Sequence, residues 1–356
     1  FYRLSPFIQD FIYREKWGEL RQIQVDAIST VLDSNDHILL TSGTASGKTE
    51  AAFLPTLTDL YEHPSASIGA MYVGPLKALI NDQFYRLEGL LEDSGIPVQS
   101  WHGDISQSKK QRFLHKGQGI LQITPESLEA MLINRQTELS RLFGDLRYVV
   151  LDEVHALIDS DRGRQVLCHL QRIARYQARP ARRIGLSATL GEPELAMAWL
   201  AGGTDLAVKH INDKRKGREV LLGLEHFIVA DEKDQPDLDV VLEEPDNQID
   251  ETDDLFQHMA EMVNSSRKTL IFANSRSDTE ETIQNLRRIA GVEGEDEDGY
   301  YVHHGSISAA LRESAEQDMR DPDKSACVAA TITLELGIDI GNLDQVLQVN
   351  ANNTVS

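Results

Sequence analysis

The sequence predicts an α/β protein built from parallel sheets with helices on both faces, arranged as two successive units. Short apolar or β-branched runs alternate with longer helical patterns, which is typical of such sheets. In the first unit the predicted strands are residues 38–40, 68–73, 119–123, 148–151 and 184–186. In the second they are residues 221–229, 268–273, 300–303, 326–331 and 345–349. At 356 residues the chain is long enough for two domains, each with its own core.

Helix start signals and apolar stripes support the helices between these strands. Thr124 followed by Pro125 is typical of an N-cap with proline at the first helical position. In the second unit, Ser277 and Glu280 predict a capping box ahead of a new helix. Residues at helical spacing predict core-facing stripes, formed by Val166, Leu167, Leu170, Ile173 and Ala174 and by Ile283, Leu286 and Ile289.

The connection between the two units changes composition along its length. Residues 209–218 are basic, residues 221–229 predict an edge strand, and residues 231–254 contain 12 acids and a single lysine. A run of this kind is usually a solvated loop. We therefore expect a first domain at residues 1–208 and a second at residues 209–356, with an acidic loop at 231–254.

Residues 42–49 (SGTASGKT) form the motif that predicts nucleotide binding. They lie between a predicted strand and a helix-prone segment, which is the order found in the phosphate cradle of the P-loop. We expect Lys48 to reach the β- and γ-phosphates and the Thr49 hydroxyl to coordinate Mg²⁺. Ser42 replaces the first Gly of the general motif, as in many nucleic-acid motors. Small residues let backbone N–H groups close on phosphates, here those of Thr44, Ala45, Ser46 and Gly47.

A pair of acids after a buried strand predicts the second half of this site. Asp152 and Glu153 follow the apolar residues 148–151, so that Asp152 stands where Mg²⁺ needs its second protein ligand. Glu153 is placed to orient or deprotonate the attacking water. We therefore take Lys48, Asp152 and Glu153 as the candidate catalytic residues.

The net charge of the chain is negative, which by itself argues against a nucleic-acid partner, but the acidic residues are concentrated in two short segments. The formal net charge is −22, but most of it comes from residues 231–254 and from five acids in residues 293–298. Five arginines form an acid-free stretch, and residues 209–218 are also basic. The arginines of the first stretch are Arg172, Arg175, Arg179, Arg182 and Arg183. For both basic stretches, phosphate binding and a solvated surface remain open as alternatives.

Cysteine usage and hydropathy bound the compartment. Cys168 and Cys327 lie far apart, which favours buried thiols in a reducing compartment. No apolar run approaches the length of a membrane span, and no signal-peptide pattern opens the chain. We expect a soluble cytoplasmic protein without a membrane partner.

Taken in order, these segments resemble the superfamily 2 nucleic-acid helicases of the DEAD/DEAH type, and within them the large helicase-related (Lhr-type) group. The resemblance covers nearly the whole chain. It is carried in the first unit by the P-loop and by residues 23–24 (IQ), 74–79 (GPLKAL), 124–127 (TPES), 152–155 (DEVH), 162–163 (RG) and 185–189 (GLSAT). In the second unit it is carried by residues 271–276 (IFANSR), 303–306 (HHGS) and 331–341, which end in LELGIDIG.

The resemblance implies two tandem RecA-like domains with ATP and Mg²⁺ in the cleft between them. Gln24 would contact adenine, and Gly337 and Asp339 would face the nucleotide from the second domain. The residues that would couple the nucleotide to the other domain are His155, Ser187 and Thr189. A nucleic-acid strand would lie along Pro75, Lys77, Thr124 and Pro125 in the first domain and along Asn274, Arg276, His304, Gly305 and Thr331 in the second.

The family pattern also sets expectations about the ends of the chain. The chain begins at Phe1 rather than Met, so we expect a piece of a longer protein. It stops at Ser356, before the arginine-bearing motif that would supply an arginine finger, so we expect the second domain to be incomplete.

These observations predict the motor core of an ATP-dependent helicase or translocase that acts on single-stranded or duplex nucleic acid, with DNA favoured over RNA. Two alternatives are a duplex-DNA translocase that does not unwind and an ATP-gated nucleic-acid binding module. Residues 187–189 (SAT) argue mildly against the first, and the intact P-loop and acidic pair argue against the second.

Overall fold

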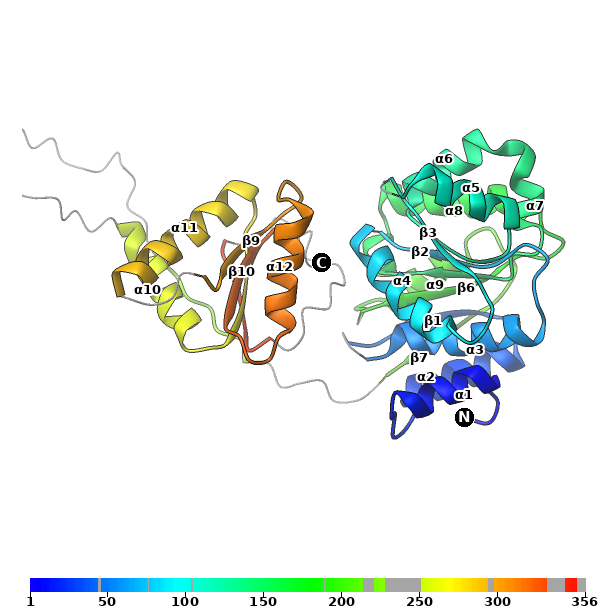
Figure 1. The fold of residues 1–356 in the computed structure, drawn as a ribbon, viewed down its shortest axis with the longest axis horizontal. Coiled ribbons are helices and arrows are strands. Elements are labelled where there is room, and N and C mark those ends of the chain that lie inside the picture. The colour runs from blue at the N-terminus through cyan, green and yellow to red at the C-terminus, as the bar shows by residue number, and fades with distance from the viewer. Residues whose placement is uncertain are drawn as a thin grey trace, which may run out of the picture. The chain divides into compact units, whose positions relative to one another are not determined.

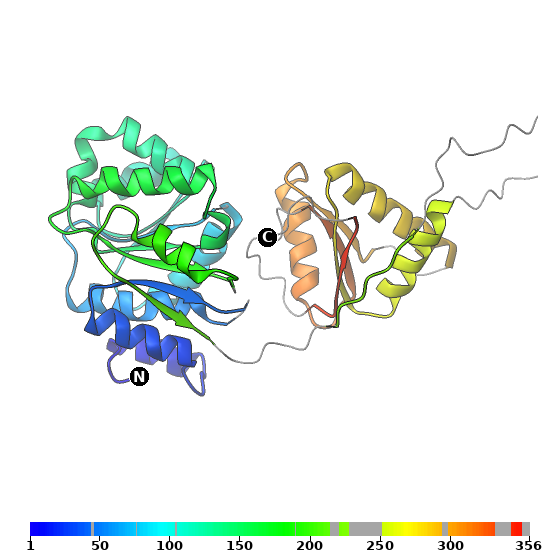
Figure 2. The same cartoon turned by 180° about the vertical axis from the view of Figure 1, so that it is seen from behind.

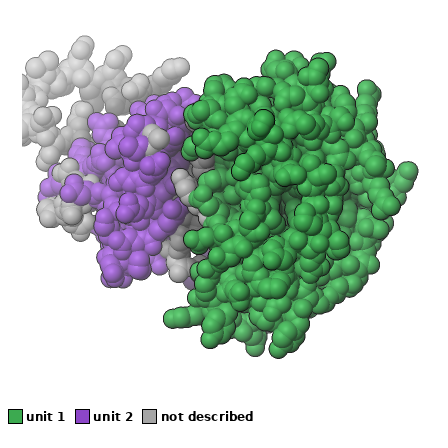
Figure 3. Space-filling model, turned by 45° about the vertical axis from the view of Figure 1, so that its right-hand side comes forward, with its two compact units in different colours: residues 1–218 green, residues 219–356 purple. Residues whose placement is uncertain are grey.

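The computed structural model describes residues 1–43, 46–75, 77–103, 105–188, 190–213, 221–227, 251–293, 298–331 and 343–350. The chain forms two units, Phe1–Arg218 and Glu219–Ser356, which are coloured separately in Figure 3. Each unit is a parallel α/β fold, as the sequence predicts.

The sheet of the first unit has seven strands in the order β3-β4-β2-β5-β6-β1-β7, and every neighbouring pair is parallel (Figure 1). In chain order the strands are β1 (His37–Thr41), β2 (Ile68–Val73), β3 (Val98–Trp101), β4 (Gly119–Ile123), β5 (Tyr148–Leu151), β6 (Arg182–Ser187) and β7 (Val208–Asn212). Because the strands are parallel, all their carboxyl ends meet at one edge of the sheet, here called the carboxyl edge. The loops that carry the predicted motifs lie there.

Helices cover both faces of this sheet, and side chains of alternating strand residues pack against each layer (Figures 1 and 2). One layer consists of α1 (Pro6–Arg14), α2 (Gln22–Asp33), α3 (Lys48–Glu62) and α4 (Lys77–Leu91). The other consists of α5 (Gln107–Lys116), α6 (Pro125–Asn134), α7 (Leu139–Phe143), α8 (Asp161–Ala174) and α9 (Pro193–Ala201). On β1, Ile38 and Leu40 face the first layer and Leu39 the second. Two short 3₁₀ turns, Gln136–Glu138 and Val154–Ala156, complete the unit.

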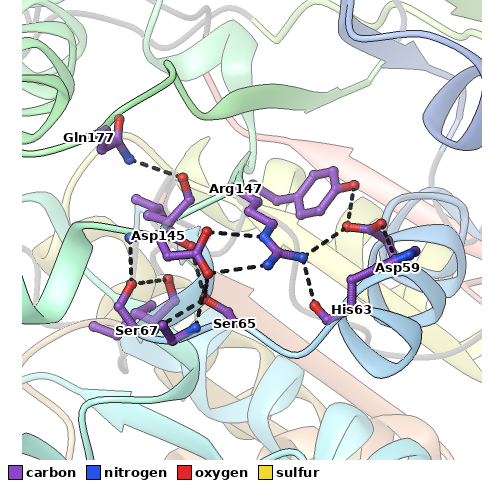
Figure 4. Close-up of polar contacts among 11 residues, drawn as sticks. Asp59, His63, Ser65, Ser67, Asp145, Arg147 and Gln177 are labelled. Atoms are coloured by element: carbon purple, nitrogen blue, oxygen red, sulfur yellow. Dashed lines mark hydrogen bonds and ion pairs between the residues drawn. The ribbon is translucent and has the colours of Figure 1, made fainter.

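The opposite, amino edge of the sheet is closed by a polar network (Figure 4). Asp145 accepts hydrogen bonds from the Ser65 hydroxyl at 3.0 Å and the Ala66 N–H at 2.9 Å, and it pairs with Arg147 at 3.2 Å. Arg147 in turn donates to the carbonyl of His63 at 2.6 Å. The network ties the loop before β2 to the loop before β5, so it serves the fold and lies away from the predicted motifs.

Two arginines of the basic stretch are buried at the same edge. Arg182 donates to three carbonyls around the end of α2, among them Val31 at 2.6 Å. Arg183 donates to the carbonyls of Leu200 and Gly202 at 2.7 and 2.8 Å, where α9 ends. Carbonyls at a helix C-terminus lack intrahelical donors and carry partial negative charge, so cations stabilise them. These two residues therefore fit neither of the alternatives left open for the stretch, phosphate binding or a solvated surface.

The second unit contains a smaller parallel sheet in the order β11-β8-β10-β9. Its strands are β8 (Lys268–Phe272), β9 (Tyr300–His303), β10 (Ala326–Ala330) and β11 (Gln345–Gln348). Helices α10 (Glu251–Asn264) and α11 (Arg276–Glu293) pack on one face, and α12 (Ala309–Arg320) packs on the other (Figure 1).

Local details differ from the sequence predictions. Residues 208–212, the last of which were expected in a linker, form the edge strand β7, where charged residues such as Lys209 are tolerated. Residues 221–227 lie in no strand, and residues 228–229 lie outside the described residues. The cap of α11 is formed by Ser275, whose Oγ accepts from the N–H of Asp278 at 3.1 Å, and not by Ser277. A serine is followed three residues later by an acid at both positions, so the sequence alone could not choose between them.

Two further findings bear on the expected compartment. Cys327 is buried but Cys168 is exposed, so the expectation of buried thiols is wrong for Cys168. Its position on α8 lies off the stripe that packs on the sheet. None of the helices in the described part of the chain has the length and apolar character that a bilayer crossing requires.

Candidate nucleotide site and nucleic-acid interface

The phosphate-binding motif occupies the turn between β1 and α3, as its sequence predicts. Gly47 is the N-cap of α3 with φ +83°, a left-handed conformation that glycine adopts without strain. The hydroxyls of Ser42 and Ser46 are hydrogen-bonded to one another across the loop, which gives a physical role to the serine that replaces the first glycine. Thr44 and Ala45 lie outside the described residues.

Lys48 is directed into this loop from the first turn of α3. Its Nζ donates to the carbonyls of Ser42 at 2.6 Å and Gly43 at 3.0 Å. Burial lowers the pKa of the Lys48 ammonium, and the carboxylates of Glu153 and Asp152 oppose this change. Two backbone oxygens thus hold the ammonium over the loop, and phosphate oxygens could replace them.

Asp152 follows β5 at the carboxyl edge, and both of its carboxylate oxygens receive a hydrogen bond. The Tyr72 hydroxyl donates to Oδ2, and the Glu153 N–H donates to Oδ1 at 2.9 Å. Only 8% of Asp152 is exposed, and burial raises the pKa of its carboxyl although both donors oppose that effect. Asp152 is therefore a buried carboxylate held by defined donors, unlike a solvated turn residue.

Glu153 is held in an unusual backbone conformation beside it. Its φ of +49° lies in the left-handed region, which is sparsely populated by residues other than glycine and is associated with functional sites. Burial, and then the neighbouring Asp152 carboxylate, raise the pKa of Glu153 to about 7. A carboxylate with a pKa near neutrality is suited to accept a proton.

His155 joins the acidic pair to the end of β6. Its Nδ1 lies 3.1 Å from the Oγ of Ser187 and 3.4 Å from Oε2 of Glu153. The carbonyl of Ser187 also accepts the N–H of Ser42, at 3.3 Å. Of the predicted coupling residues, His155 therefore contacts the acidic pair and Ser187 contacts the P-loop, whereas Thr189 lies outside the described residues.

Gln24 lies against the P-loop from helix α2. It is 3% exposed, and its Oε1 accepts the N–H of Arg21 at 2.9 Å. A Cβ added to Gly47 would come within 2.7 Å of Gln24 Nε2. The side chain predicted to contact adenine is therefore next to the phosphate loop.

In the first unit, the residues predicted to bind nucleic acid line up along the carboxyl edge. Pro75 follows β2, and Thr124 and Pro125 follow the neighbouring strand β4, where Val73 is paired with Ile123. Thr124 also caps α6, because its Oγ1 accepts the N–H of Ser127 at 3.3 Å. Lys77 is the first residue of α4, and its side chain lies outside the described residues.

The next strand along this edge ends in residues that the sequence analysis missed. His102 and Gly103 follow β3, whose Trp101 is paired with Ile123 of β4. The signal that could have found them is a repeat, since residues 102–106 (HGDIS) match residues 304–308 (HGSIS) of the second unit at four of five positions. Both copies make the same turn, with the Ile N–H bonded to the His carbonyl, and both end in the serine N-cap of a helix.

Helix α5, which begins just after this turn, is basic. It has no acidic residue, and Lys109 and Arg112 are exposed. The Lys110 ammonium lies 5.5 Å from the centre of the Trp101 ring, a cation–π distance. Basic surface was expected at residues 172–183 and 209–218 and not in this helix.

The predicted residues of the second unit gather at the carboxyl ends of β8, β10 and β9. The Arg276 guanidinium donates to the Ser306 hydroxyl at 2.8 Å, and a Cβ added to Gly305 would lie 4.0 Å from the same guanidinium. His304 is buried and pairs with Glu280 at 2.9 Å. Asn274 is exposed after β8, and Thr331 follows β10. Gly337 and Asp339 lie outside the described residues.

Two models of known protein families match the chain. The family model described as DEAD/DEAH box helicase matches residues 21–197, and the helicase conserved C-terminal domain matches residues 250–356. Together they cover most of the chain. The chain belongs to the superfamily 2 helicases of the Lhr type. The family consists of ATP-dependent enzymes with tandem RecA-like domains, so the predicted family and fold class are confirmed.

Individual relatives share the full extent of the chain at moderate identity. The ATP-dependent helicase Lhr-Core of Methanothermobacter thermautotrophicus is 29% identical over 99% of this chain and 41% of its own length. The Lhr-Core helicase of Sulfolobus acidocaldarius is 31% identical over 97% of this chain and 39% of its own length. The structure of Mycobacterium smegmatis helicase Lhr bound to ssDNA and AMP-PNP has a TM-score of 0.74 and 28% identity, covering 98% of this chain and 44% of that one. The chain thus spans about two-fifths of these Lhr-type helicases.

Proposed function

We propose that this chain is the motor core of an ATP-dependent nucleic-acid helicase, in which ATP hydrolysis drives movement along a strand. The observation that carries the proposal is the series of contacts from Glu153 through His155 to Ser187, whose backbone in turn holds the P-loop. It joins a candidate base to the loop that would hold the phosphates. Burial and the Asp152 carboxylate raise the pKa of this base, Glu153, to about 7, which favours an enzyme with turnover over a binding module.

In the proposed reaction Lys48 exchanges the carbonyls of Ser42 and Gly43 for the β- and γ-phosphate oxygens. The Glu153 carboxylate accepts a proton from water as the water oxygen bonds to the γ-phosphorus, and the bond from that phosphorus to the bridging oxygen breaks. ADP and phosphate are the products. Positioning and charge neutralisation account for most of such catalysis.

The residues of the first unit also fit Mg²⁺, which prefers oxygen ligands and retains waters. Thr49 Oγ1 and the Asp152 carboxylate are the two protein ligands that we propose. Gln83 lies beside Thr49, and its Nε2 is 3.5 Å from the Oγ1 of Thr49. The Oε1 of Gln83 is buried and has no hydrogen-bond partner among the described residues. A water molecule bound to the ion would satisfy this oxygen. When bound, the ion would neutralise charge on the β- and γ-phosphates.

We infer that the nucleic-acid strand lies along the carboxyl edge of each sheet. Pro75, Lys77, Thr124 and Pro125 would line it in the first unit, joined by the turn at His102. Asn274, Arg276, His304, Gly305 and Thr331 would line it in the second. Hydrogen bonds to phosphates would give affinity with little sequence preference. DNA is favoured over RNA because the Mycobacterium smegmatis Lhr structure contains ssDNA.

For the remaining predicted residues, we propose that Gln24 contacts adenine and that Gly337 and Asp339 face the nucleotide. Thr189 would act with His155 and Ser187 in coupling. We also propose a first, ATP-binding domain followed by a second domain, with the change between residue 208, where the sequence predicted it, and Arg218, where the first unit ends.

A pair of variants tests the proposal by separating binding from turnover. Lys48→Ala should abolish ATP binding, whereas Glu153→Gln should bind ATP normally and lose roughly 10²–10⁴ in turnover. Nucleotide affinity is measured by fluorescence titration, and ATPase rates are measured with single-stranded DNA, duplex DNA and RNA. Near-normal turnover in Glu153→Gln would reject the base. Strand displacement is measured on the same nucleic acids. If they stimulate the ATPase but no strand is displaced, the protein is a translocase that does not unwind.

A further inference from the structure

A tyrosine in the middle of the first sheet contacts the acidic pair, although the sequence analysis gave it no role. Tyr72 lies on β2, next to the strand that leads into Asp152, and it is fully buried. Its hydroxyl donates to Oδ2 of Asp152. Its ring lies 6.1 Å from the ring of Phe53 on α3, the helix that begins with the P-loop lysine.

The hydroxyl fixes the orientation of the Asp152 carboxylate. Oδ1 is already held by the N–H of Glu153 at 2.9 Å, so the bond from Tyr72 to Oδ2 restrains the plane of the carboxylate as well as its position. Each oxygen has two lone-pair directions, and the described residues donate one hydrogen bond to each oxygen, which leaves the second direction for an incoming ligand. A hydrogen-bonded carboxylate of this kind is typical of metal sites, where partners outside the ligand shell orient the ligands.

The ring of Tyr72 also contacts the segment that leads into Pro75. A Cβ added to Gly74 would lie 3.0 Å from Cε1 of Tyr72 and 3.2 Å from Ile80. A larger residue at position 74 would crowd the ring of Tyr72, and glycine avoids this contact. The same strand end is bonded to the acidic strand, because the Asp152 N–H donates to the carbonyl of Val73 at 3.0 Å.

We propose that Tyr72 is a positioning residue that sets the Asp152 carboxylate for Mg²⁺ bound with nucleotide. The inference rests on the proposed function, since it concerns the ion that Asp152 would hold. Tyr72 touches neither nucleotide nor ion in this assignment and acts only through Asp152. Its ring, wedged between Phe53 and Gly74, keeps the hydroxyl in place.

The chain offers a matched control for the test. Tyr148 lies on the neighbouring strand β5, is 5% exposed, and donates its hydroxyl to Oδ2 of Asp59 at 2.9 Å. This bond joins the polar network at the amino edge of the same sheet. Tyr72→Phe and Tyr148→Phe therefore each remove one hydroxyl bonded to a carboxylate, and only the first removes it from the proposed site.

The experiment measures Mg²⁺ dependence of nucleotide binding and does not rely on turnover. A fluorescent ATP analogue is titrated with each protein, first in EDTA and then at rising Mg²⁺. Tyr72→Phe should need a roughly 10- to 100-fold higher Mg²⁺ concentration for half-maximal enhancement, the usual effect of losing such a partner, with unchanged binding in EDTA. Tyr148→Phe should match the wild type in both conditions, whatever its melting temperature.

The outcomes separate the inference from the proposed function. If the wild type shows no Mg²⁺-dependent binding, the proposed function fails, and the role of Tyr72 fails with it. If the wild type responds to Mg²⁺ and Tyr72→Phe responds at the same concentration, only the role of Tyr72 is wrong. Should Tyr72→Phe not fold, Gly74→Ala decides, because it keeps the hydroxyl but crowds the ring. Its Mg²⁺ requirement should rise, and an unchanged requirement would overturn the inference.

Discussion

The Nδ1 of His155 lies 3.1 Å from the Oγ of Ser187, at the point where the strand β6 ends. The same nitrogen lies 3.4 Å from Glu153, so one imidazole contacts both the proposed base and the neighbouring strand. Ser187 is fully buried, and its carbonyl holds the N–H of Ser42. A displacement of Ser187 would therefore change the position of both the proposed base and the phosphate loop.

We expect Ser187→Ala to weaken the coupling between nucleic acid and hydrolysis more than hydrolysis itself. Residues that transmit such coupling typically contribute about 0.5–2 kcal/mol, which corresponds to a loss of roughly 2- to 30-fold in nucleic-acid stimulation of the ATPase. The unstimulated rate should change little. Ser67→Ala is the matched control, because Ser67 is also buried but accepts the N–H of Asp145 at the amino edge. Equal losses of stimulation in both variants would contradict the assignment.

The raised pKa of Glu153 predicts a pH dependence of ATP hydrolysis. The base works as the carboxylate, so kcat/KM should rise with pH and level off above about 7, the pKa to which burial raises this group. kcat/KM is the proper measure, because it reports groups of the free protein. The rising limb should be absent from the residual activity of Glu153→Gln. A limb centred near 4.5, the ordinary value for glutamate, would show that the carboxyl is not perturbed in the working protein.

The basic helix α5 predicts a share of the electrostatic affinity for nucleic acid. Replacing Lys109, Lys110 and Arg112 together by Gln should weaken binding of single strands. It should also reduce the slope of log affinity against log salt by about 0.7 for each phosphate that the helix no longer neutralises. Affinity measured by fluorescence anisotropy at several salt concentrations checks this. Arg3→Gln removes a cation that is already paired with Asp33 at 2.5 Å, and it should leave the slope unchanged.

The buried arginine Arg183 predicts a loss of stability unrelated to nucleic acid. Burial lowers its pKa to about 10, so the charge carries a desolvation cost, but the guanidinium satisfies the carbonyls of Leu200 and Gly202. Arg183→Met removes that cost but leaves both carbonyls without this donor. We expect the loss of the donor to be the larger effect, so that the free energy of unfolding falls by about 1–3 kcal/mol. Arg175→Met, on the exposed side of the same stretch, should stay within about 0.5 kcal/mol. Urea unfolding measures both, and equal stabilities would contradict the role of Arg183.

The sequence by itself determined the elements whose signals are local. Alternating apolar runs predicted the parallel strands, the cap at Thr124 predicted the start of α6, and the order of strand, small-residue loop and helix predicted the P-loop. These signals depend on residues a few positions apart, because backbone periodicity and helix caps are set by near neighbours. The acidic pair after β5 was predicted for the same reason.

Only the tertiary structure decided which distant residues meet. Tyr72 reaches Asp152 because β2 and β5 are adjacent in the sheet, although 80 residues separate the two side chains. Arg182 and Arg183 are buried because β6 brings them to the ends of α2 and α9, whereas their sequence pattern is that of an exposed basic stretch. His155 contacts Ser187 because the strands before them, β5 and β6, are neighbours. Strand order arises from the packing of the whole chain, so no local pattern encodes it.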